Sequence, residues 1–376
     1  MNKKRIVFLT GTRADFGKMK SLIKITQNSS LFDVHIFVTG MHMIEQYGKT
    51  IIEVQKSGFK NIYPFINHDE IVHMDRNLAT TINGFSHYIG EMKPDLIVVH
   101  GDRIEAMAGA IVGSLNNILV AHIEGGEISG TIDELIRHSI SKLAHIHLVS
   151  NEQAKKRLVQ MGEYEEAIFT IGSPDLDIMN SKELPTLEFV KNYYQINFEK
   201  YALLMFHPVT TELKQMKKQV KVFVDAIIKS NQNYIVIYPN NDMGSNLILQ
   251  EYERFENNEK IKIFPSLRFE FFLVLLKHAQ FVIGNSSAGV REAPYYHIPT
   301  VNIGNRQNNR VSSKNIINVE YKEDLILEAI TNALGKGRVE QDVDFGEGKS
   351  DENFLKLLSD EVVWKISNQK QFRDIG

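Results

Sequence analysis

Short runs of β-branched and aromatic residues alternate along the chain with longer segments in which apolar residues recur at helical spacing. This alternation predicts βαβ units built around parallel sheets. The pattern occurs twice, and helical stretches such as 15–27 and 104–115 separate the strands. The expected strands are 5–9, 34–38, 96–100, 119–123 and 146–149 in the first half, and 201–206, 234–238, 262–264, 281–283 and 300–303 in the second.

The length of 376 residues exceeds what one hydrophobic core usually organises, so two domains of roughly 150 to 200 residues are expected. Glycine and proline residues that interrupt helices and strands lie at 172–174 and 184–186, where a linker would fall. We therefore expect an α/β protein with a Rossmann-like doubly wound domain at 1–172 and a second one at 173–350. The tail from 351 has helical spacing, and we expect residues 351–376 to pack back across the domain junction.

Composition excludes several classes of protein. The formal net charge of −3 provides no global basic field for nucleic acid, and the absence of cysteine excludes disulfides and thiolate metal sites. The apolar run 6–9 is too short for a signal-peptide core or a membrane span. A cytoplasmic protein with no membrane partner is expected. His145 with His147, and His122 with Glu124, lack a convincing third ligand, so no metal is expected.

Ligands of doubly wound sheets bind beyond the carboxyl ends of the strands, so residues that follow the predicted strands are the candidates. The first group is the turn at 10–18, which opens a helix and carries Arg13 and Lys18. Backbone N–H groups, a helix start and two cations suit a phosphate. The alternative is an ordinary turn with Asp15 near the helix cap. The turn is not a Walker A loop.

Three carboxylates follow predicted strands of the first half. Asp102 and Arg103 follow strand 96–100, Glu124 ends strand 119–123 before two glycines, and Asp133 lies in the first turn of the next helix. Carboxylates that converge compete for protons and are tuned as general acids or bases. The alternatives are a cap with a surface ion pair for Asp102 and Arg103, and an i,i+4 pair with Arg137 for Asp133.

Candidates in the second half also follow strands. His207 and Asn240 come directly after two of them, although a lone histidine is more often structural than catalytic. The segment 283–292 combines Ser286, Ser287 and Gly289 with a helix start that suits a diphosphate, and Glu292 suits the two hydroxyls of a ribose. The alternative for the serines is a plain helix N-cap.

Taken together, the segments GTRADFGK, HGDR, HIEGGEISGTIDELIRH, FHP, GNSSAGVRE and GNRQ resemble the UDP-N-acetylglucosamine 2-epimerase family, in the family's order and across both halves. They look like its hydrolysing branch, the sialic-acid type. The resemblance implies a glycosyltransferase B fold with the active site in the cleft between the domains. It implies UDP contacts by Arg13, His207, Ser286, Ser287, Glu292 and Arg306, and catalytic roles for Asp102, Glu124 and Asp133. We expect Lys18, Arg103, Asn240 and Gly289 to belong to the same UDP site, and His207 to take part in catalysis as well.

Departures from the non-hydrolysing pattern favour the hydrolysing branch. Asp133-Glu134 stands where the non-hydrolysing branch has Glu-Glu. The loop 127–131 is acidic, and Arg103 follows Asp102. The implied reaction releases UDP by anti elimination to 2-acetamidoglucal and then adds water, giving N-acetylmannosamine for sialic acid biosynthesis. Positive charge from Arg13, His207 and the loop 284–289 would stabilise the departing diphosphate. No cofactor is needed, and no GxGxxG motif follows a strand.

Four alternatives stay open. The chain could be a non-hydrolysing epimerase, or a hydrolysing enzyme that acts on a UDP-2,4-diacetamido-2,4,6-trideoxyhexose of the legionaminic type. A glycosyltransferase on the same architecture and a non-catalytic nucleotide-sugar sensor are further possibilities, although three clustered carboxylates exceed what either requires. The resemblance also implies a homodimer or homotetramer.

Overall fold

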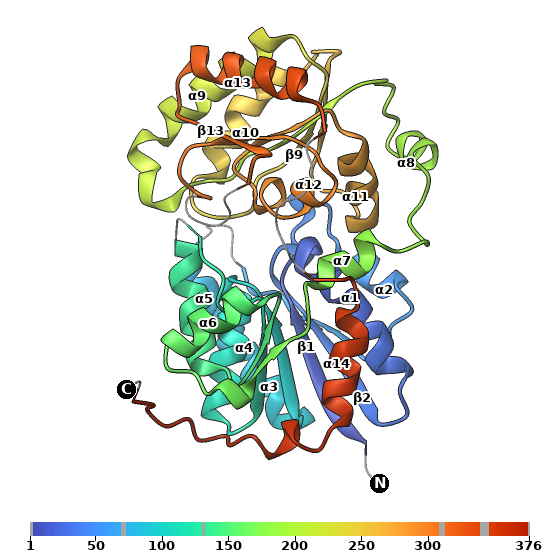
Figure 1. The fold of residues 1–376 in the computed structure, drawn as a ribbon, viewed down its shortest axis with the longest axis vertical. Coiled ribbons are helices and arrows are strands. Elements are labelled where there is room, and N and C mark those ends of the chain that lie inside the picture. The colour runs from blue at the N-terminus through green and yellow to red at the C-terminus, as the bar shows by residue number, and fades with distance from the viewer. Residues whose placement is uncertain (1–2, 69–72, 130–131, 308–312, 339–345, 375–376) are drawn as a thin grey trace. The chain divides into compact units, whose positions relative to one another are not determined.

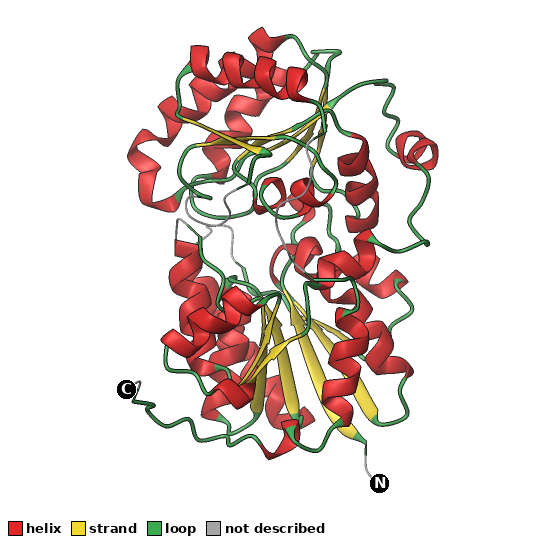
Figure 2. Ribbon diagram, in the orientation of Figure 1, coloured by secondary structure: helices red, strands yellow, loops and turns green. Residues whose placement is uncertain are grey.

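The computed structural model describes residues 3–68, 73–129, 132–307, 313–338 and 346–374. The chain forms two compact units (Figure 1). The first comprises Met1–Glu127, Asp133–Lys182 and Asp344–Gly376, and the second comprises Ile128–Ile132 and Glu183–Val343. In Figure 2 each unit has its own group of strands flanked by helices. The prediction of two Rossmann-like α/β domains of the glycosyltransferase B type is therefore confirmed.

The first unit is built on a seven-stranded parallel sheet of order β3-β2-β1-β4-β5-β6-β7. All five residues of β4 and of β5 are buried, as expected for strands covered by helices on both faces. The chain order reverses between β1 and β4, which makes the carboxyl ends of these strands the topological switch point. The strands are β1 Lys4–Thr10, β2 Phe32–Val38, β3 Ile62–Pro64, β4 Leu96–His100, β5 Leu119–Ile123, β6 Ile146–Val149 and β7 Ile168–Thr170.

Helices cover both faces of this sheet. On one face, Phe8 and its neighbours pack against α1 and α14, with the rings of Phe8 and Phe354 6.1 Å apart. On the other face, α4 lies so close that a Cβ at Gly113 would come within 2.3 Å of Val120. The helices are α1 Arg13–Asn28, α2 Ile51–Lys56, α3 Met74–Met92, α4 Ile104–Leu115, α5 Ile132–Leu143, α6 Glu152–Gln160, α7 Pro174–Met179 and α14 Ser350–Ser359, with short 3-10 turns η1 Gly40–Met43, η2 Glu45–Tyr47, η3 Glu165–Ala167 and η7 Val363–Lys365.

The second unit contains a six-stranded parallel sheet of order β10-β9-β8-β11-β12-β13. Its core places α9, α10 and α13 against one face, where Phe206 and Phe223 stack with centroids 4.6 Å apart. The chain order reverses between β8 and β11. The strands are β8 Ala202–Met205, β9 Tyr234–Ile237, β10 Ile261–Phe264, β11 Val282–Gly284, β12 Thr300–Ile303 and β13 Ile316–Val319; the helices are α8 Leu187–Tyr193, α9 Leu213–Ser230, α10 Ser245–Tyr252, α11 Phe269–His278, α12 Glu292–Tyr295 and α13 Glu323–Lys336, with 3-10 turns η4 Thr210–Glu212, η5 Glu253–Phe255 and η6 Ser287–Gly289.

The unit boundaries differ from the expected ones. The first unit continues to Lys182 because α7 packs against α1 and α14. The tail is helical only to Ser359, apart from the short turn η7, and α14 packs on the first unit. The strands β3, β7 and β13 were not predicted. Each lies at a sheet edge, two have only three residues, and β3 ends in Pro64, so no long apolar run marks them.

Within the part of the chain that the structure describes, no helix is both long enough and apolar enough to cross a membrane.

Candidate active site

The turn between β1 and α1 is a capping box. Thr12 is the N-cap of α1, and its hydroxyl accepts from the N–H of Asp15. The Asp15 carboxylate accepts from the backbone N–H groups of Gly11 and Thr12, both at 2.9 Å, and from the Thr10 hydroxyl at 2.7 Å. The carboxylate therefore already uses two of the N–H groups that the sequence offered to a phosphate, as the alternative interpretation of Asp15 expected.

Both predicted cations of this segment have acidic partners within the first unit. Arg13 forms an ion pair with Glu53 of α2. Lys18 is buried, and its Nζ lies 3.4 Å from Oε1 of Glu124 and 3.1 Å from Oδ2 of Asp175. The fold thus brings Lys18 of α1 together with the carboxylate that follows β5.

Glu124 is buried at the end of β5 in a left-handed backbone conformation, with φ of 64°. Its N–H donates to the carbonyl of Leu148 on β6 at 3.1 Å, which holds this conformation. A non-glycine residue in this region is strained, and such residues gather at functional sites. His100, at the tip of β4, places Nε2 3.3 Å from Oε1 of Glu124.

Asp102 follows β4 and is half-buried. Its carboxylate accepts from Arg137, whose side chain on α5 is only 1% exposed. The helix cap of α4 is Arg103, not Asp102, and Arg103 lies 3.5 Å from the buried carboxylate of Glu105. The alternative of a capping aspartate with a surface ion pair is therefore wrong.

His122 of β5 holds the loop at Gly101 in place through a hydrogen bond. The Nε2 atom of His122 lies 2.7 Å from the carbonyl oxygen of Gly101, and Nδ1 lies 3.0 Å from the hydroxyl of Ser141. Burial lowers the pKa of His122 to about 3, so the ring is neutral and donates through Nε2–H.

Asp133 lies in the first turn of α5, one turn before Arg137. Of the acidic loop 127–131, Gly130 and Thr131 lie outside the described residues.

In the second unit, Asn285 organises the ends of β8 and β11. Its fully buried side chain accepts from the N–H of His207 at 2.7 Å and donates to the carbonyl of His207 at 2.9 Å. The N–H of Asn240 donates to Nδ1 of His207 at 3.0 Å, which places the proton of the neutral ring on Nε2. The side chain of Asn240 donates to Asp242.

The segment that follows β11 has the predicted strand, turn and helix. Ser286 caps η6, and Ser286 and Ser287 are half-buried. Glu292 is buried and begins the four-residue helix α12. The guanidinium of Arg306 donates to the carbonyl of Asn285 at 3.2 Å. The structure thus brings Arg306, Asn285 and His207 together at the carboxyl ends of neighbouring strands.

Two glycines of the predicted motifs are required by close packing. Gly284 has φ of 132°, and a Cβ there would lie 1.9 Å from the carbonyl oxygen of Met205. A Cβ at Gly289 would lie 2.7 Å from the methyl group of Thr300. The hydroxyl of Thr300 donates to the carbonyl of Gly289 at 2.6 Å.

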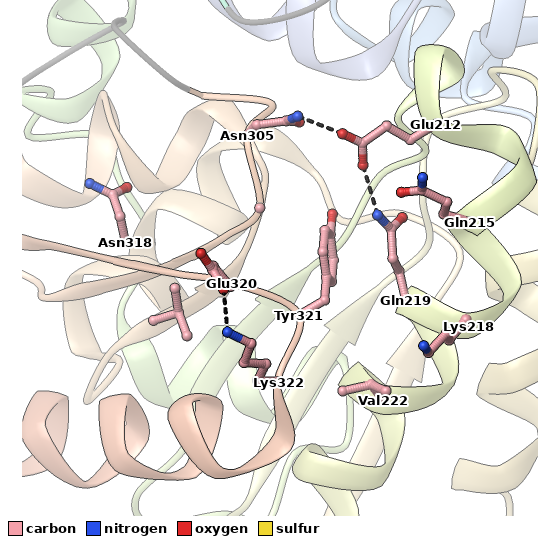
Figure 3. Close-up of a pocket in the computed structure, with 12 residues that line it drawn as sticks. Glu212, Gln215, Lys218, Gln219, Val222, Asn305, Asn318, Glu320, Tyr321 and Lys322 are labelled. Atoms are coloured by element: carbon pink, nitrogen blue, oxygen red, sulfur yellow. Dashed lines mark hydrogen bonds and ion pairs between the residues drawn. The ribbon is translucent and has the colours of Figure 1, made fainter.

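A cavity of about 770 Å³ lies in the second unit beside α9 and the ends of β12 and β13 (Figure 3). Glu212 lies on its wall and accepts from Gln219 at 2.7 Å and from Asn305. Among the described residues that line it, none is a predicted UDP-binding residue.

The described residues contain no group of three or more His, Cys, Asp or Glu side chains arranged to hold a metal ion. Three residues that the sequence did not single out take part in the site: His100, Asp175 and Asn285. His100 is the last residue of β4, Asn285 directly follows β11, and Asp175 comes five residues after β7, so their positions were a usable signal. Asp175 was hidden because the preceding Gly172-Ser173-Pro174 marked a linker.

Comparison with known proteins agrees with the geometry. A family model described as UDP-N-acetylglucosamine 2-epimerase matches residues 24–359. The UDP-N-acetylglucosamine 2-epimerase of Neisseria meningitidis serogroup B is 50% identical over 376 residues, which is 99% of this chain and 100% of that protein. The UDP-N,N'-diacetylbacillosamine 2-epimerase (hydrolyzing) of Legionella pneumophila is 36% identical and covers 94% of this chain and 95% of its own length.

A solved structure has the same fold. The Methanocaldococcus jannaschii UDP-GlcNAc 2-epimerase in complex with UDP-GlcNAc and UDP matches with a TM-score of 0.79 at 23% identity, over 94% of this chain and 99% of that chain. The family model and the two relatives span nearly the whole sequence. The chain belongs to the UDP-N-acetylglucosamine 2-epimerase family.

Proposed function

We propose that this protein is a hydrolysing UDP-N-acetylglucosamine 2-epimerase, which converts UDP-GlcNAc and water into N-acetylmannosamine and UDP for sialic acid biosynthesis. The observation that carries the proposal is the pair of carboxylates at neighbouring strand tips. Asp102 is paired with the buried guanidinium of Arg137, whereas Glu124 shares the ammonium of Lys18 with Asp175. Two carboxylates in different ionic environments suit a reaction that removes a proton from one face of a sugar and returns one to the other.

The first step is an elimination. The bond from C1 to the UDP oxygen breaks with its electron pair on the diphosphate, and the C2 proton passes to a carboxylate, so that a C1–C2 double bond forms. The departing diphosphate gains negative charge, which Arg13, Arg306 and the Nε2–H of His207 would stabilise. Because Arg13 is paired with Glu53 before substrate binds, its contact with phosphate requires an exchange of partners.

The second step adds water across the double bond. The water oxygen bonds to C1, its proton passes to a carboxylate, and a second acid group delivers a proton to C2 from the opposite face. The acid–base set is Asp102, Glu124 and Asp133. The net change is one water consumed, UDP released and the configuration at C2 inverted.

UDP is assigned to the second unit. Ser286, Ser287 and Gly289 would hold phosphate oxygens, and the buried carboxylate of Glu292 would accept from the ribose hydroxyls. The likeness to a structure described as a complex with UDP-GlcNAc and UDP supports a UDP-sugar as ligand. Lys18, Arg103 and Asn240 were also predicted to contact UDP. In the protein without ligand their side chains contact Asp175, Glu105 and Asp242, so binding of UDP by any of them requires an exchange of partners, as for Arg13.

A hydrolysing relative introduces a second candidate substrate. The Legionella relative is a hydrolysing 2-epimerase of UDP-N,N'-diacetylbacillosamine, whereas the more similar Neisseria relative is a UDP-GlcNAc 2-epimerase. The difference in identity, 50% against 36%, supports UDP-GlcNAc. A homodimer or homotetramer stays part of the proposal, and light scattering of the purified protein tests it.

The test is a proton NMR time course of the protein with UDP-GlcNAc in deuterated water. The expected products are free UDP and N-acetylmannosamine that carries deuterium at C2. Asp102→Asn should abolish the reaction. Asp95→Asn is the matched control, because Asp95 lies just before β4 and pairs with Lys4 at the opposite end of the strand.

Each other outcome selects an alternative. A UDP-linked N-acetylmannosamine product would assign the chain to the non-hydrolysing branch. Turnover of the diacetamido sugar alone would assign it to the second substrate. UDP-sugar binding without turnover of either compound would leave a sensor and would contradict the proposal.

A further inference from the structure

Lys18 lies between two carboxylates that come from different parts of the first unit. Its Nζ is 3.1 Å from Oδ2 of Asp175 and 3.4 Å from Oε1 of Glu124. The exposed fractions of the three side chains are 9% for Lys18 and 4% for each carboxylate. Salt and water screen such a buried group weakly, so its charges interact strongly.

The fold determines this arrangement. Pro174 begins α7, which puts Asp175 in the first helical turn. Because α7 packs against α1, Asp175 faces Lys18, and the left-handed backbone of Glu124 directs the second carboxylate to the same ammonium. The shorter distance is the one to Asp175, so this residue holds the ammonium at least as closely as Glu124 does.

A histidine and a second aspartate lie near this group. His100 of β4 contacts Glu124 at 3.3 Å. Asp177, on the same helix as Asp175, has other partners: it accepts from the N–H and hydroxyl of Ser350, from the N–H of Asp351, and from Ser21 at 3.0 Å. Asp351, which directly follows Ser350, is the first acidic residue of α14. Lys18 is thus the cation that links Asp175 to Glu124.

We propose that Asp175 is a positioning residue of the active site, which holds Lys18 against Glu124 and divides the ammonium charge between the two carboxylates. The proposal extends the function proposed above, in which Glu124 is one of the acid–base groups. A carboxylate with an ammonium to itself gives up its proton more easily than one that shares the ammonium with a second anion. Asp175 therefore keeps Glu124 a better proton acceptor than Lys18 alone would allow.

The test removes the charge of Asp175 at constant shape. Asp175→Asn removes one of the two anions that contact the ammonium of Lys18, so Glu124 should titrate at a lower pH than in the wild-type protein. The measurement is a pH titration of the side-chain carboxyl carbon of Glu124 by NMR in protein labelled with ¹³C at glutamate, with the resonance assigned by its loss in Glu124→Gln. The corresponding limb of the pH profile of kcat/KM should move in the same direction. The value of kcat should fall about tenfold while KM stays within about a factor of two.

Asp177→Asn is the matched control. Asp177 lies on the same helix as Asp175, but its carboxylate contacts Ser350 of α14 and not Lys18. We expect it to lower thermal stability and leave the Glu124 titration unchanged. Asp175→Ser is a second variant with the same expected shift, in case the asparagine does not fold.

An unchanged Glu124 titration in folded Asp175 variants, or an equal shift in Asp177→Asn, would overturn the inference. Failure of the proposed function is distinguishable from this result. If the wild-type protein does not release UDP, the function is wrong, and the NMR titration still decides whether Asp175 controls the charge near Glu124.

Discussion

Arg137, almost completely buried on α5, donates to the carboxylate of Asp102 at the tip of β4. The pair joins the helix that carries Asp133 to the strand end that carries Asp102. The hydrogen bond from Nη2 of this buried guanidinium to Oδ2 fixes the direction of the Asp102 carboxylate, and a charge-assisted bond of this kind is stronger than a neutral one.

Replacing Arg137 by lysine should therefore impair catalysis while the charge is kept. Lysine keeps the positive charge but lacks the rigid planar group whose Nη2 reaches Oδ2 of Asp102, so the carboxylate would be less well oriented, and kcat should fall about 10- to 100-fold. Steady-state kinetics of UDP release measure this. Arg254→Lys is the control, because Arg254 forms exposed pairs with Asp225 and Glu251 in the second unit and should keep wild-type rates. Equal rates for Arg137→Lys and wild type would contradict this role for the guanidinium.

The sequence predicted which candidate residues would follow the strands, because parallel strands covered on both faces are continuous apolar runs whose ends can be located. Asp102, Glu124, His207 and Ser286 all follow strands as expected. It could not predict which charges would pair. The sequence offers Arg137 as an i,i+4 partner of Asp133, and in the structure Arg137 pairs with Asp102 on another element.

Long-range contacts explain the other omissions. Asp175 meets Lys18 only because α7 packs on α1, and no local pattern encodes that contact. Asn285 binds both backbone groups of His207 across two strands that are distant in sequence and adjacent in the sheet. Pairing of this kind depends on strand order, which a periodicity of apolar residues does not determine.

Removing the side chain of Asn285 should weaken UDP binding. In Asn285→Ala the N–H and carbonyl of His207 lose their partners, so the segment that carries the proposed phosphate contact is no longer fixed. Two part-buried polar groups left without these bonds should cost about 1 to 3 kcal/mol of unfolding free energy. Calorimetric titration with UDP should show an affinity loss of about tenfold or more.

Asn302→Ala is the control for Asn285→Ala. Asn302 is also buried, on β12, but its side chain donates to Asn318 and not to the His207 segment. It should lower stability and leave the affinity for UDP unchanged. An equal loss of affinity in both variants would show that Asn285 acts only through general stability.

Gly284→Ala should prevent stable folding of the second unit. The added Cβ would overlap the carbonyl oxygen of Met205, a backbone atom held in the sheet, and the backbone conformation of Gly284 is unfavourable for alanine. We expect a loss of about 3 to 5 kcal/mol in denaturant unfolding. Gly335→Ala is the control, because nothing lies within 4 Å of the added Cβ at this position in α13. It should be neutral or stabilise by up to about 1 kcal/mol, and similar losses in both variants would contradict the steric argument.

Glu163 should make stability depend on pH in the acid range. Burial by itself raises the pKa of Glu163, but a hydrogen bond from His147 and the ammonium groups of Lys370 and Lys142 outweigh burial and lower the pKa to about 2. Burial also lowers the pKa of His147, so the ring donates to the carboxylate as a neutral group. Lys370 also donates to the carbonyls of Ser141 and Ala144, so this cluster fastens the C-terminal segment to the first unit.

The sign follows from the lowered pKa. The carboxylate of Glu163 contributes stability above its ordinary pKa of 4.5, and this contribution is lost as the pH falls towards about 2. Glu163→Gln should therefore be less stable than wild type by about 3 kcal/mol at about pH 7, with a smaller difference at about pH 3. Urea unfolding of both proteins across this range measures the difference. Glu165→Gln, which removes an exposed carboxylate paired with Lys155, should match wild type throughout, and a difference for Glu163→Gln that does not change with pH would show that lost packing, not ionisation, is responsible.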